Sequence, residues 1–201
     1  KFITFEGGEG AGKSTQGRLL KTALEACGHA VVLTREPGGS PGAEEIRKLL
    51  VEGEPGRWSA LSETLLFVAA RADHVEKTIE PALQKGAWVI SDRFSDSTYV
   101  YQGIARGLGV DKVRALQHAA LGAYAPDLTL IVDVDPNEGL KRAHGRGHPA
   151  ENRFEKFDGG FHARLRSAFR EIAAREPERC VLIDGTRTVE AVAADIWRAV
   201  E

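Results

Sequence analysis

Short apolar runs alternate along this chain with longer stretches in which apolar residues recur every three or four positions. The short runs have the length and composition of buried strands, and the longer stretches have the spacing of amphipathic helices. Strands are predicted at residues 2–5, 30–34, 87–91, 128–133 and 181–184. Four of these five runs show little polar alternation, which is typical of parallel strands covered on both faces. The pattern therefore predicts an α/β fold with a five-stranded parallel sheet flanked by helices on both faces.

Helices are expected in the intervals between the predicted strands. They fall at residues 15–27, 43–51, about 59–84, 111–122, 136–142, 157–175 and 188–200. Pro81 lies near the end of the third helix and is expected to bend it, and Asp111 is expected to cap the helix that begins there. Residues 95–103 fit either the start of a helix or a structured loop. We expect residues 1–201 to form a single domain whose site lies beyond the carboxyl ends of the strands.

A glycine-rich segment, GGEGAGKS at residues 7–14, follows the first predicted strand and opens the first predicted helix. It matches the phosphate-binding pattern G-x-x-x-x-G-K-[ST] in full and in the right context. Its glycines allow backbone N–H groups to point at an anion, and the helix N-terminus adds partial positive charge. We expect Lys13 to reach the β- and γ-phosphates of ATP and Ser14 to bind Mg²⁺. The residues expected to bind ATP are Gly7, Gly8, Glu9, Gly10, Ala11, Gly12, Lys13, Ser14 and Thr15. The pattern thus predicts a P-loop NTPase fold.

Two acidic residues at the ends of predicted strands are candidates for a second metal ligand. Asp92 and Asp133 each close an apolar run downstream of the phosphate-binding loop, where an acidic residue approaches Mg²⁺ directly or through water. Asp92 is favoured because the neighbouring Arg93 adds a guanidinium that binds phosphate. A solvated ion pair at the end of a strand is the structural alternative.

Three features favour transfer between two phosphates over hydrolysis. Arg47, Arg71 and Arg93 all lie near predicted strand ends, where an anion is expected. Phe67 and Arg71 are one helical turn apart, so a ring that stacks on a base lies beside a guanidinium that bonds the base edge. The third feature is a segment at about residues 142–155, in which basic residues alternate with glycine and proline. It predicts a mobile basic lid over the triphosphate, with the arginines Arg142, Arg146 and Arg153.

Composition excludes several other classes of protein. The formal net charge of −2 at pH 7 gives no overall basic field for nucleic acid or an anionic membrane. No apolar run approaches the roughly 20 residues that span a bilayer, and no signal peptide is recognised. Cys27 and Cys180 are far apart in sequence and are expected to be small core residues with free thiols. We expect a cytoplasmic protein.

Five stretches together resemble the thymidylate kinases of the bacterial type, within the P-loop nucleoside monophosphate kinase family, and the resemblance covers nearly the whole chain. They are FEGGEGAGKSTQ at 5–16, TREPGG at 34–39, LFVAARADH at 66–74, DRFSDSTYVYQG at 92–103 and GLKR at 139–142. The first stretch alone indicates only a phosphate-binding loop, whereas the second and fourth together are specific to this family. The resemblance implies phosphorylation of dTMP to dTDP with ATP and Mg²⁺, a step of dTTP synthesis.

The same resemblance implies roles for individual residues. Phe67 is expected to stack on thymine, Arg71 to bond its edge, and Tyr101 to press on the sugar and select deoxyribose. Glu9 is expected to face the 3′-hydroxyl. Arg47 and Arg93 are expected to hold the acceptor phosphate, and the acceptor pocket is expected to include Glu36, Pro37, Ser97 and Gln102. Gly10 stands where some family members carry a catalytic arginine, so Arg142 and Arg146 in the lid are expected to supply it, beside Lys13 and Arg93. The resemblance also implies a homodimer, with residues 111–122 and the helix around Phe67 as candidate interfaces.

Two other functions remain open at this stage. One is a P-loop kinase for a different small acceptor, such as another nucleoside monophosphate or shikimate. The pairing of Phe67 with Arg71 favours a base over a sugar acid. The other is a nucleotide sensor that binds ATP without turnover, against which the complete set of Lys13, Ser14, Asp92 and lid arginines counts.

Overall fold

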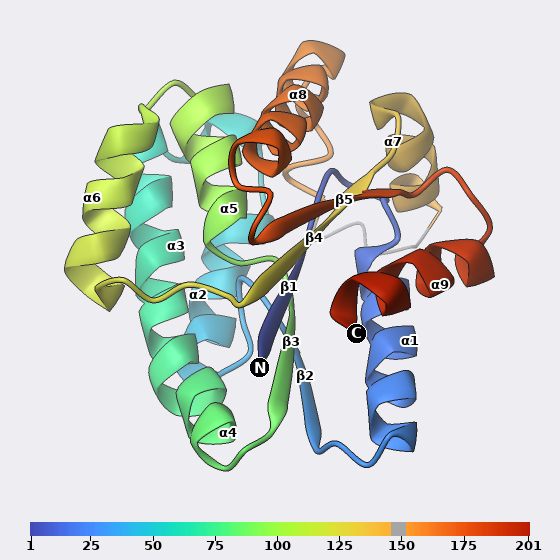
Figure 1. Ribbon diagram of the computed structural model, residues 1–201. Coiled ribbons are helices and arrows are strands. Elements are labelled where there is room, and N and C mark those ends of the chain that lie inside the picture. The colour runs from blue at the N-terminus through green and yellow to red at the C-terminus, as the bar shows by residue number, and fades with distance from the viewer. Residues whose placement is uncertain (146–151) are drawn as a thin grey trace.

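Five parallel strands form one sheet in the computed structural model, which describes residues 1–145 and 152–201 (Figure 1). The strands are β1 (Phe2–Glu6), β2 (Val31–Arg35), β3 (Trp88–Asp92), β4 (Leu128–Asp133) and β5 (Cys180–Asp184). Their order is β2-β3-β1-β4-β5, so β1 lies in the middle and the loop after it is central. The predicted α/β fold with a parallel sheet is confirmed.

Helices cover both faces of this sheet (Figure 1). The helices are α1 (Lys13–Ala26), α2 (Pro41–Val51), α3 (Ala60–His74), α4 (Glu80–Gln84), α5 (Ser95–Thr98), α6 (Val110–Leu121), α7 (Pro136–His144), α8 (Gly159–Arg175) and α9 (Val189–Val200). On one face, α1 and α9 pack on Ile3, Phe5 and Leu130. On the other, α8 packs on Ile131, and Phe2 joins the side chains of the segment that precedes β3. Each buried aromatic or aliphatic side chain stabilises the fold by about 1.5–3 kcal/mol. The apolar clusters on the two faces of the sheet therefore hold in place the edge that carries the site.

Adjacent residues of β1 serve different purposes because they face opposite sides of the sheet. Ile3 and Phe5 enter the apolar core under α1 and α9. Thr4 and Glu6 are polar and fully buried on the other face, where the Thr4 hydroxyl lies 2.9 Å from that of Thr129. The strand therefore carries a polar residue to the very point where the phosphate-binding loop begins.

One sequence prediction about a helix end is wrong in detail. Gly109, with φ of 94°, is the N-cap of α6, and Asp111 lies inside the first turn. Just before Pro81, where a bend is expected, a wider π-helical turn at Val75–Ile79 joins α3 to α4. A second π-helical turn at Tyr99–Ala105 continues α5, so the stretch that fitted either a helix or a loop is helical. A short 3₁₀ helix spans Pro55–Arg57.

The segment predicted as a lid at about 142–155 falls into three parts. Residues 142–144 complete α7, residues 146–151 lie outside the described residues, and residues 152–155 pack against the body of the protein. Cys27 is exposed and Cys180 is buried, both as free thiols, so only Cys180 is the core residue that was expected. Within the described residues, none of the helices has the combination of length and apolar character needed to cross a bilayer.

Candidate active site

The loop between β1 and α1 is built so closely against its neighbours that two of its glycines have no room for a side chain. Gly7 has φ of 128°, and a Cβ there would lie 2.4 Å from the Val132 carbonyl oxygen. Gly10 has φ of 66°, and a Cβ there would lie 1.8 Å from the Gly139 carbonyl oxygen. The loop is therefore held between β4 and α7, with its curvature fixed before any nucleotide binds.

Lys13, the first residue of α1, is folded into this loop. Its Nζ donates to the carbonyl oxygens of Gly8, at 2.7 Å, and Gly7, at 3.2 Å. Burial lowers the pKa of Lys13 to about 8, helped by the charge of Arg93 and opposed by Asp92 and Glu9. The ammonium group has exchanged water for two carbonyl oxygens, so an incoming phosphate offers it a stronger partner.

Ser14 and Asp92 come together at the start of α1 and the end of β3. The Ser14 hydroxyl donates to Asp92 Oδ2 at 2.5 Å. A hydroxyl and a carboxylate oxygen are hard ligands of the kind that Mg²⁺ prefers, with the remaining positions filled by water and phosphate. The described part of the chain has no cluster of three or more His, Cys, Asp or Glu suited to a metal.

Asp133, the alternative metal ligand, is already occupied by α8. Its carboxylate accepts from Arg166 at 2.8 and 3.0 Å and from Arg170 at 2.7 Å. Burial alone would raise the pKa of the Asp133 carboxyl, but the hydrogen bonds and charges of Arg166 and Arg170 outweigh burial and lower this pKa. The geometry therefore favours Asp92 and makes Asp133 an anchor for α8.

Arg93 stands at the centre of the site and has a strained backbone. Its φ is 73°, a left-handed conformation that is rare for a residue with a side chain and that clusters at functional sites. Its guanidinium donates to Gly7 O at 3.1 Å, to Ser97 Oγ at 3.0 Å and to Glu9 Oε1 at 2.9 Å. It also lies 5.0 Å from the centre of the Tyr101 ring. Arg93 thus joins the phosphate-binding loop to the segment that carries Ser97 and Tyr101.

Glu9 is the anionic partner of this arginine. Burial alone would raise its pKa, but Arg93 and Lys13 more than offset burial and bring it down to about 2. The Tyr101 hydroxyl donates to the same Glu9 oxygen at 2.8 Å. Burial also raises the pKa of Tyr101 well above its ordinary value, so its hydroxyl stays protonated as a donor.

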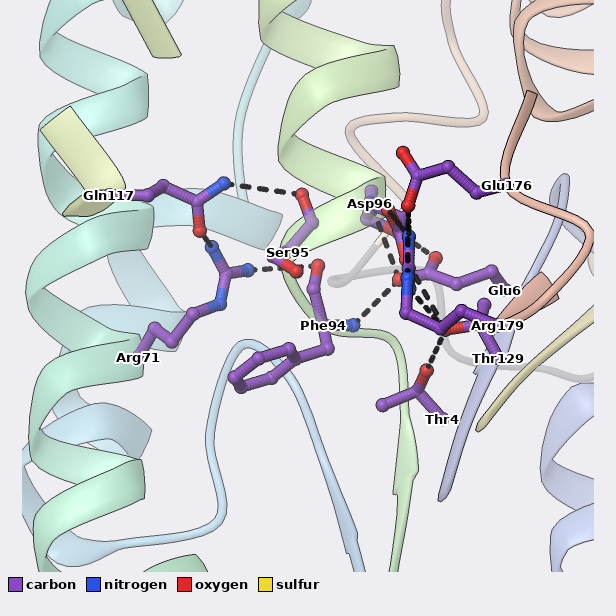
Figure 2. Close-up of polar contacts among 11 residues, drawn as sticks. Thr4, Glu6, Arg71, Phe94, Ser95, Asp96, Gln117, Thr129, Glu176 and Arg179 are labelled. Atoms are coloured by element: carbon purple, nitrogen blue, oxygen red, sulfur yellow. Dashed lines mark hydrogen bonds and ion pairs between the residues drawn. The ribbon is translucent and has the colours of Figure 1, made fainter. Parts of the chain in front are cut away.

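Glu6 lies beneath the site, at the end of β1. It accepts from the backbone N–H of Phe94 at 2.8 Å, and from the N–H and hydroxyl of Ser97 at 3.2 and 2.5 Å. Burial and the nearby charge of Asp96 raise the pKa of Glu6 to about 7, against the opposing effect of Arg93. Figure 2 shows this region, where Asp96 is in turn bound by Arg179 at 2.7 and 3.0 Å. These contacts fix the start of α5 and hence the hydroxyl that Arg93 binds.

Arg71 is almost wholly buried and is held by acceptors from three different segments. Its Nε donates to Glu36 Oε2 at 2.7 Å, its Nη1 to Gln117 Oε1 at 2.5 Å and its Nη2 to Phe94 O at 3.0 Å. Figure 2 shows Gln117 reaching down from α6 to meet it. The other oxygen of Glu36 lies 3.0 Å from His74 Nδ1. The guanidinium is therefore fixed in the wall of a pocket with little freedom to turn.

That pocket has a volume of about 120 Å³ and brings together every residue that the sequence assigned to substrate binding. These residues are Glu9, Glu36, Pro37, Arg47, Phe67, Arg71, Arg93, Ser97, Tyr101 and Gln102. They come from the phosphate-binding loop, the segment after β2, α2, α3 and the α5 region, which meet only in the folded chain. We call it the acceptor pocket.

A larger open cleft of about 1,320 Å³ lies on the other side of Arg93. Its wall includes residues of the phosphate-binding loop and of α1, with Lys13, Ser14 and Asp92 among them. Glu9 and Arg93 border both the cleft and the acceptor pocket. We call it the donor cleft.

Five residues that border the acceptor pocket were not among those expected from the sequence: Val51, Phe94, Thr98, Phe154 and Glu155. The Thr98 hydroxyl is buried and has no hydrogen-bond partner within the described residues, although Thr98 borders the pocket. Phe154 also borders it, with its ring 6.0 Å from Phe67 and 5.6 Å from Tyr101. An aromatic residue inside an otherwise polar stretch was the available signal for Phe154, but the stretch was interpreted as lid.

The three arginines expected in the lid have different positions. Arg142, on α7, donates to Gly185 O at 3.4 Å, beside the turn after β5. Arg146 lies outside the described residues. Arg153 was wrongly expected to face the phosphates, because it is fully buried and donates to the carbonyl oxygens of Leu50, Glu54 and Pro55. It also pairs with the Glu63 carboxylate.

Comparisons with known proteins agree with this arrangement. The family model described as thymidylate kinase matches residues 5–196. The thymidylate kinase of Ruegeria pomeroyi is 56% identical over 99% of this chain and 93% of its own length. That of Caulobacter vibrioides is 54% identical over 97% of this chain and 93% of its own length.

A solved structure extends the agreement from sequence to fold. The crystal structure of thymidylate kinase from Ehrlichia chaffeensis superposes with a TM-score of 0.77 at 35% identity, covering 100% of this chain and 98% of that one. Because the family model matches residues 5–196 and these relatives cover 97–100% of this chain, the chain belongs to the thymidylate kinase family.

Proposed function

We propose that this chain uses the donor cleft and the acceptor pocket to transfer the γ-phosphoryl group of ATP to dTMP, giving ADP and dTDP with Mg²⁺ as cofactor. This is the reaction of the thymidylate kinase family to which the chain belongs. The residue assignment rests on the observation that Glu9 and Arg93 border both the donor cleft and the acceptor pocket. Phosphates bound on its two sides meet at one guanidinium, which is what direct transfer requires.

The base of dTMP is assigned to the inner end of the acceptor pocket. Phe67 supplies a ring that stacks on thymine, with Phe154 beside it. Arg71 is already oriented by its buried partners, so its remaining N–H groups meet the base edge without a large loss of freedom. The Thr98 hydroxyl, which has no hydrogen-bond partner among the described residues, and the amide of Gln102 complete the polar contacts to the base.

The sugar and phosphate of dTMP are assigned to the end of the pocket that meets the donor cleft. Tyr101 is fixed by its bond to Glu9, so its ring occupies the space beside the sugar that a 2′-hydroxyl needs. Glu9 is the acceptor available to the 3′-hydroxyl. Arg93, together with Arg47 at the opposite wall, is assigned to the acceptor phosphate, and Arg47 is oriented by its 2.7 Å bond to Pro37 O.

The donor triphosphate is assigned to the loop at residues 7–15. Lys13 transfers its bonds from the loop carbonyls to the β- and γ-phosphates, while the loop N–H groups cradle them. Ser14 and Asp92 would hold Mg²⁺, which neutralises phosphate charge when bound. The acceptor phosphate is already anionic, so these residues need only align the reactants and offset their repulsion.

Two lid arginines are assigned to the transferring phosphoryl group. Gly10 leaves no side chain in the phosphate-binding loop for this purpose. Arg142 lies on α7 beside Ala143 and His144, which border the donor cleft. Arg146 lies outside the described residues and is assigned to the same role from its place in the sequence. A guanidinium there stabilises charge that develops during transfer.

At the level of the whole protein, we propose a single-domain homodimer located in the cytoplasm. The described residues, 1–145 and 152–201, contribute to one sheet and its covering helices, which supports one kinase domain over residues 1–201 with the expected lid segment at about 142–155 within it. Leu61 and Leu65 on α3 are 42% and 47% exposed, one helical turn apart. They support α3 as part of the interface, with residues 111–122 as the neighbouring surface.

A coupled assay of ADP release tests the reaction. With ATP and Mg²⁺, turnover is expected to be highest with dTMP and roughly 10–200-fold lower with dUMP, because a methyl group contributes only about 1–3 kcal/mol in an apolar pocket. UMP and AMP are expected to be poor acceptors because of Tyr101. A preference for another monophosphate would leave a P-loop kinase and discard the base assignments. ATP binding with no acceptor-dependent turnover would indicate a sensor.

A further inference from the structure

Glu63 is a fully buried carboxylate that has no part in the reaction assigned above. It lies on α3, one helical turn before Phe67. Its two oxygens have partners of different kinds. Oε2 pairs with Arg153 and lies 2.7 Å from Arg106 Nη1, whereas Oε1 accepts from Gln102 Nε2 at 2.8 Å. One buried carboxylate thus joins two cations to a side chain of the acceptor pocket.

The two arginines hold this carboxylate in one place. Arg153 is anchored independently, because it also donates to Leu50 O at 2.9 Å, to Glu54 O at 3.0 Å and to Pro55 O at 3.0 Å. The Arg153 guanidinium therefore keeps its position and holds the Glu63 carboxylate beside it. A carboxylate paired with two guanidinium groups presents its oxygens to its neighbours as hydrogen-bond acceptors. The group that faces Gln102 is consequently a fixed acceptor.

A fixed acceptor determines which end of the Gln102 carboxamide faces it. The amide nitrogen must point to Glu63, because an amide oxygen there would oppose another oxygen. The amide oxygen is then turned away from Glu63, in a residue that borders the acceptor pocket. Across residues 1–145 and 152–201, no donor is bonded to that oxygen. It is available to a ligand.

We propose that Glu63 is a positioning residue that sets the base specificity of the acceptor pocket. By holding the Gln102 amide with its oxygen toward the base, Glu63 favours a pyrimidine with an N–H at ring position 3, as in thymine. It disfavours cytosine, whose N3 is an acceptor and would oppose the amide oxygen. This inference rests on the proposed binding of a pyrimidine monophosphate in the pocket.

The variant Glu63→Gln tests this role. The new carboxamide offers either an oxygen or a nitrogen to Gln102, so the Gln102 amide is free to rotate. The ratio of kcat/KM for dTMP to that for dCMP is expected to fall about tenfold, the size of one hydrogen-bond difference. The Glu63→Gln substitution leaves any contact of Arg71 with the exocyclic group at C4 of the base in place. That contact therefore contributes equally to the ratio in the unchanged protein and in the variant. A merely structural role for Glu63 would lower both values alike.

A double-variant cycle identifies the route of the effect. In a Gln102→Met background the amide is absent, so adding Glu63→Gln is expected to leave the dTMP to dCMP ratio unchanged. The matched control is Glu54→Gln, which removes an exposed carboxylate that pairs with Lys156 at 2.9 Å and leaves the Glu54 carbonyl in place. Its ratio is expected to equal that of the unchanged protein.

The outcomes separate this inference from the proposed function. Turnover of dTMP with an unchanged preference in Glu63→Gln would overturn the inference alone, and so would an equal shift in the Gln102→Met background. Absence of dTMP turnover in the unchanged protein would overturn the proposed function. If Glu63→Gln does not fold, Glu63→Gln combined with Arg106→Gln removes one buried positive charge with the negative one, and the same ratio is measured.

Discussion

At the scale of single residues, the site is a set of charges held in place before any ligand arrives. Glu9, Arg93 and Lys13 are all buried or nearly so, and each is bonded to protein atoms within the described structure. In a low-dielectric site such oriented charges act on a ligand more strongly than they do in water. Replacing one of them should therefore change function more than stability.

Lys13→Met is expected to reduce turnover by about 10³-fold or more while dTMP binding stays within a few-fold of that of the unchanged protein. The reason is location, since Lys13 borders the donor cleft and not the acceptor pocket. ADP release and calorimetric titration with dTMP measure the two effects. Residual turnover near the original rate would refute the assignment of the phosphate-binding loop.

Asp92→Asn and Asp133→Asn form a matched pair of strand-end substitutions. Asp92→Asn is expected to raise the Mg²⁺ concentration needed for half-maximal activity, because it weakens an oxygen ligand beside Ser14. Asp133→Asn is expected to lower the free energy of unfolding by about 1–3 kcal/mol, because it weakens the bonds from Arg166 and Arg170. Magnesium titrations and urea unfolding of both variants check this. The reverse pattern would make Asp133 the metal ligand.

Glu6 gives a prediction about pH. The folded protein keeps a proton on Glu6 up to about pH 7, whereas the unfolded chain releases it near the ordinary value of 4.5. Because the folded state then binds more protons, Glu6 makes the free energy of unfolding fall as pH rises from about 4.5 to about 7. Glu6→Gln imitates the protonated form and removes this contribution. Its stability relative to the unchanged protein should therefore rise across that window, as urea unfolding at several pH values would show. A constant difference would refute the shifted pKa.

At the scale of elements, the sequence predicted the strands well because they are buried on both faces and read as short apolar runs. It predicted the phosphate-binding loop for a different reason, since its glycine spacing is a direct consequence of close backbone packing. Helix ends were less predictable. The cap of α6 depends on a glycine with positive φ, and α3 is joined to α4 by a π-helical turn, and neither feature has a strong local pattern.

The position of Arg153 could not be predicted from the sequence because its partners are about 90–100 residues away. Local composition suggested a lid, whereas three backbone carbonyls and Glu63 form a buried socket for the guanidinium. The same non-local packing places Phe154 over the acceptor pocket and gives Thr98 its role there. The ten residues expected to bind substrate line one pocket. The resemblance supplied their positions in the sequence, whereas their hydrogen-bond partners emerged only from the fold.

Arg153→Met tests whether this socket joins α2, α3 and the segment after the lid. Removing one partner of a buried pair leaves Glu63 under-compensated, so the free energy of unfolding is expected to fall by about 3–5 kcal/mol. KM for dTMP is expected to rise, because Phe154 follows directly in the chain and borders the pocket. Urea unfolding and steady-state kinetics measure both. Lys156→Met, which loses an exposed pair with Glu54 and an exposed bond to the Gly53 carbonyl oxygen, is the control and should change stability by less than about 1 kcal/mol.

At the scale of the whole molecule, the order β2-β3-β1-β4-β5 places β3 beside the central strand β1, so the phosphate-binding loop after β1 lies next to the segment that follows β3. Glu6 ends β1, and Arg93 directly follows β3, the strand paired with β1. Arg93 also bonds the Gly7 carbonyl oxygen, so the phosphate-binding loop and the acceptor pocket cannot shift independently. All the residues assigned to the reaction come from one chain. A dimer is therefore expected to support the acceptor pocket through α3 and not to complete it.

Leu65→Glu tests that expectation. Leu65 is 47% exposed on α3, and a carboxylate buried in an apolar interface without a partner is strongly unfavourable. Sedimentation velocity is expected to show a monomer. KM for dTMP should rise more than kcat falls, because α3 carries Phe67 and Arg71 while the phosphate-binding loop is held by β1 and α1. Leu19→Glu is the control, since Leu19 is 40% exposed on α1, on the other face of the sheet. A dimer that persists with Glu at position 65 but dissociates with Glu at position 19 would place the interface on the α1 side, and α3 would then be a free surface.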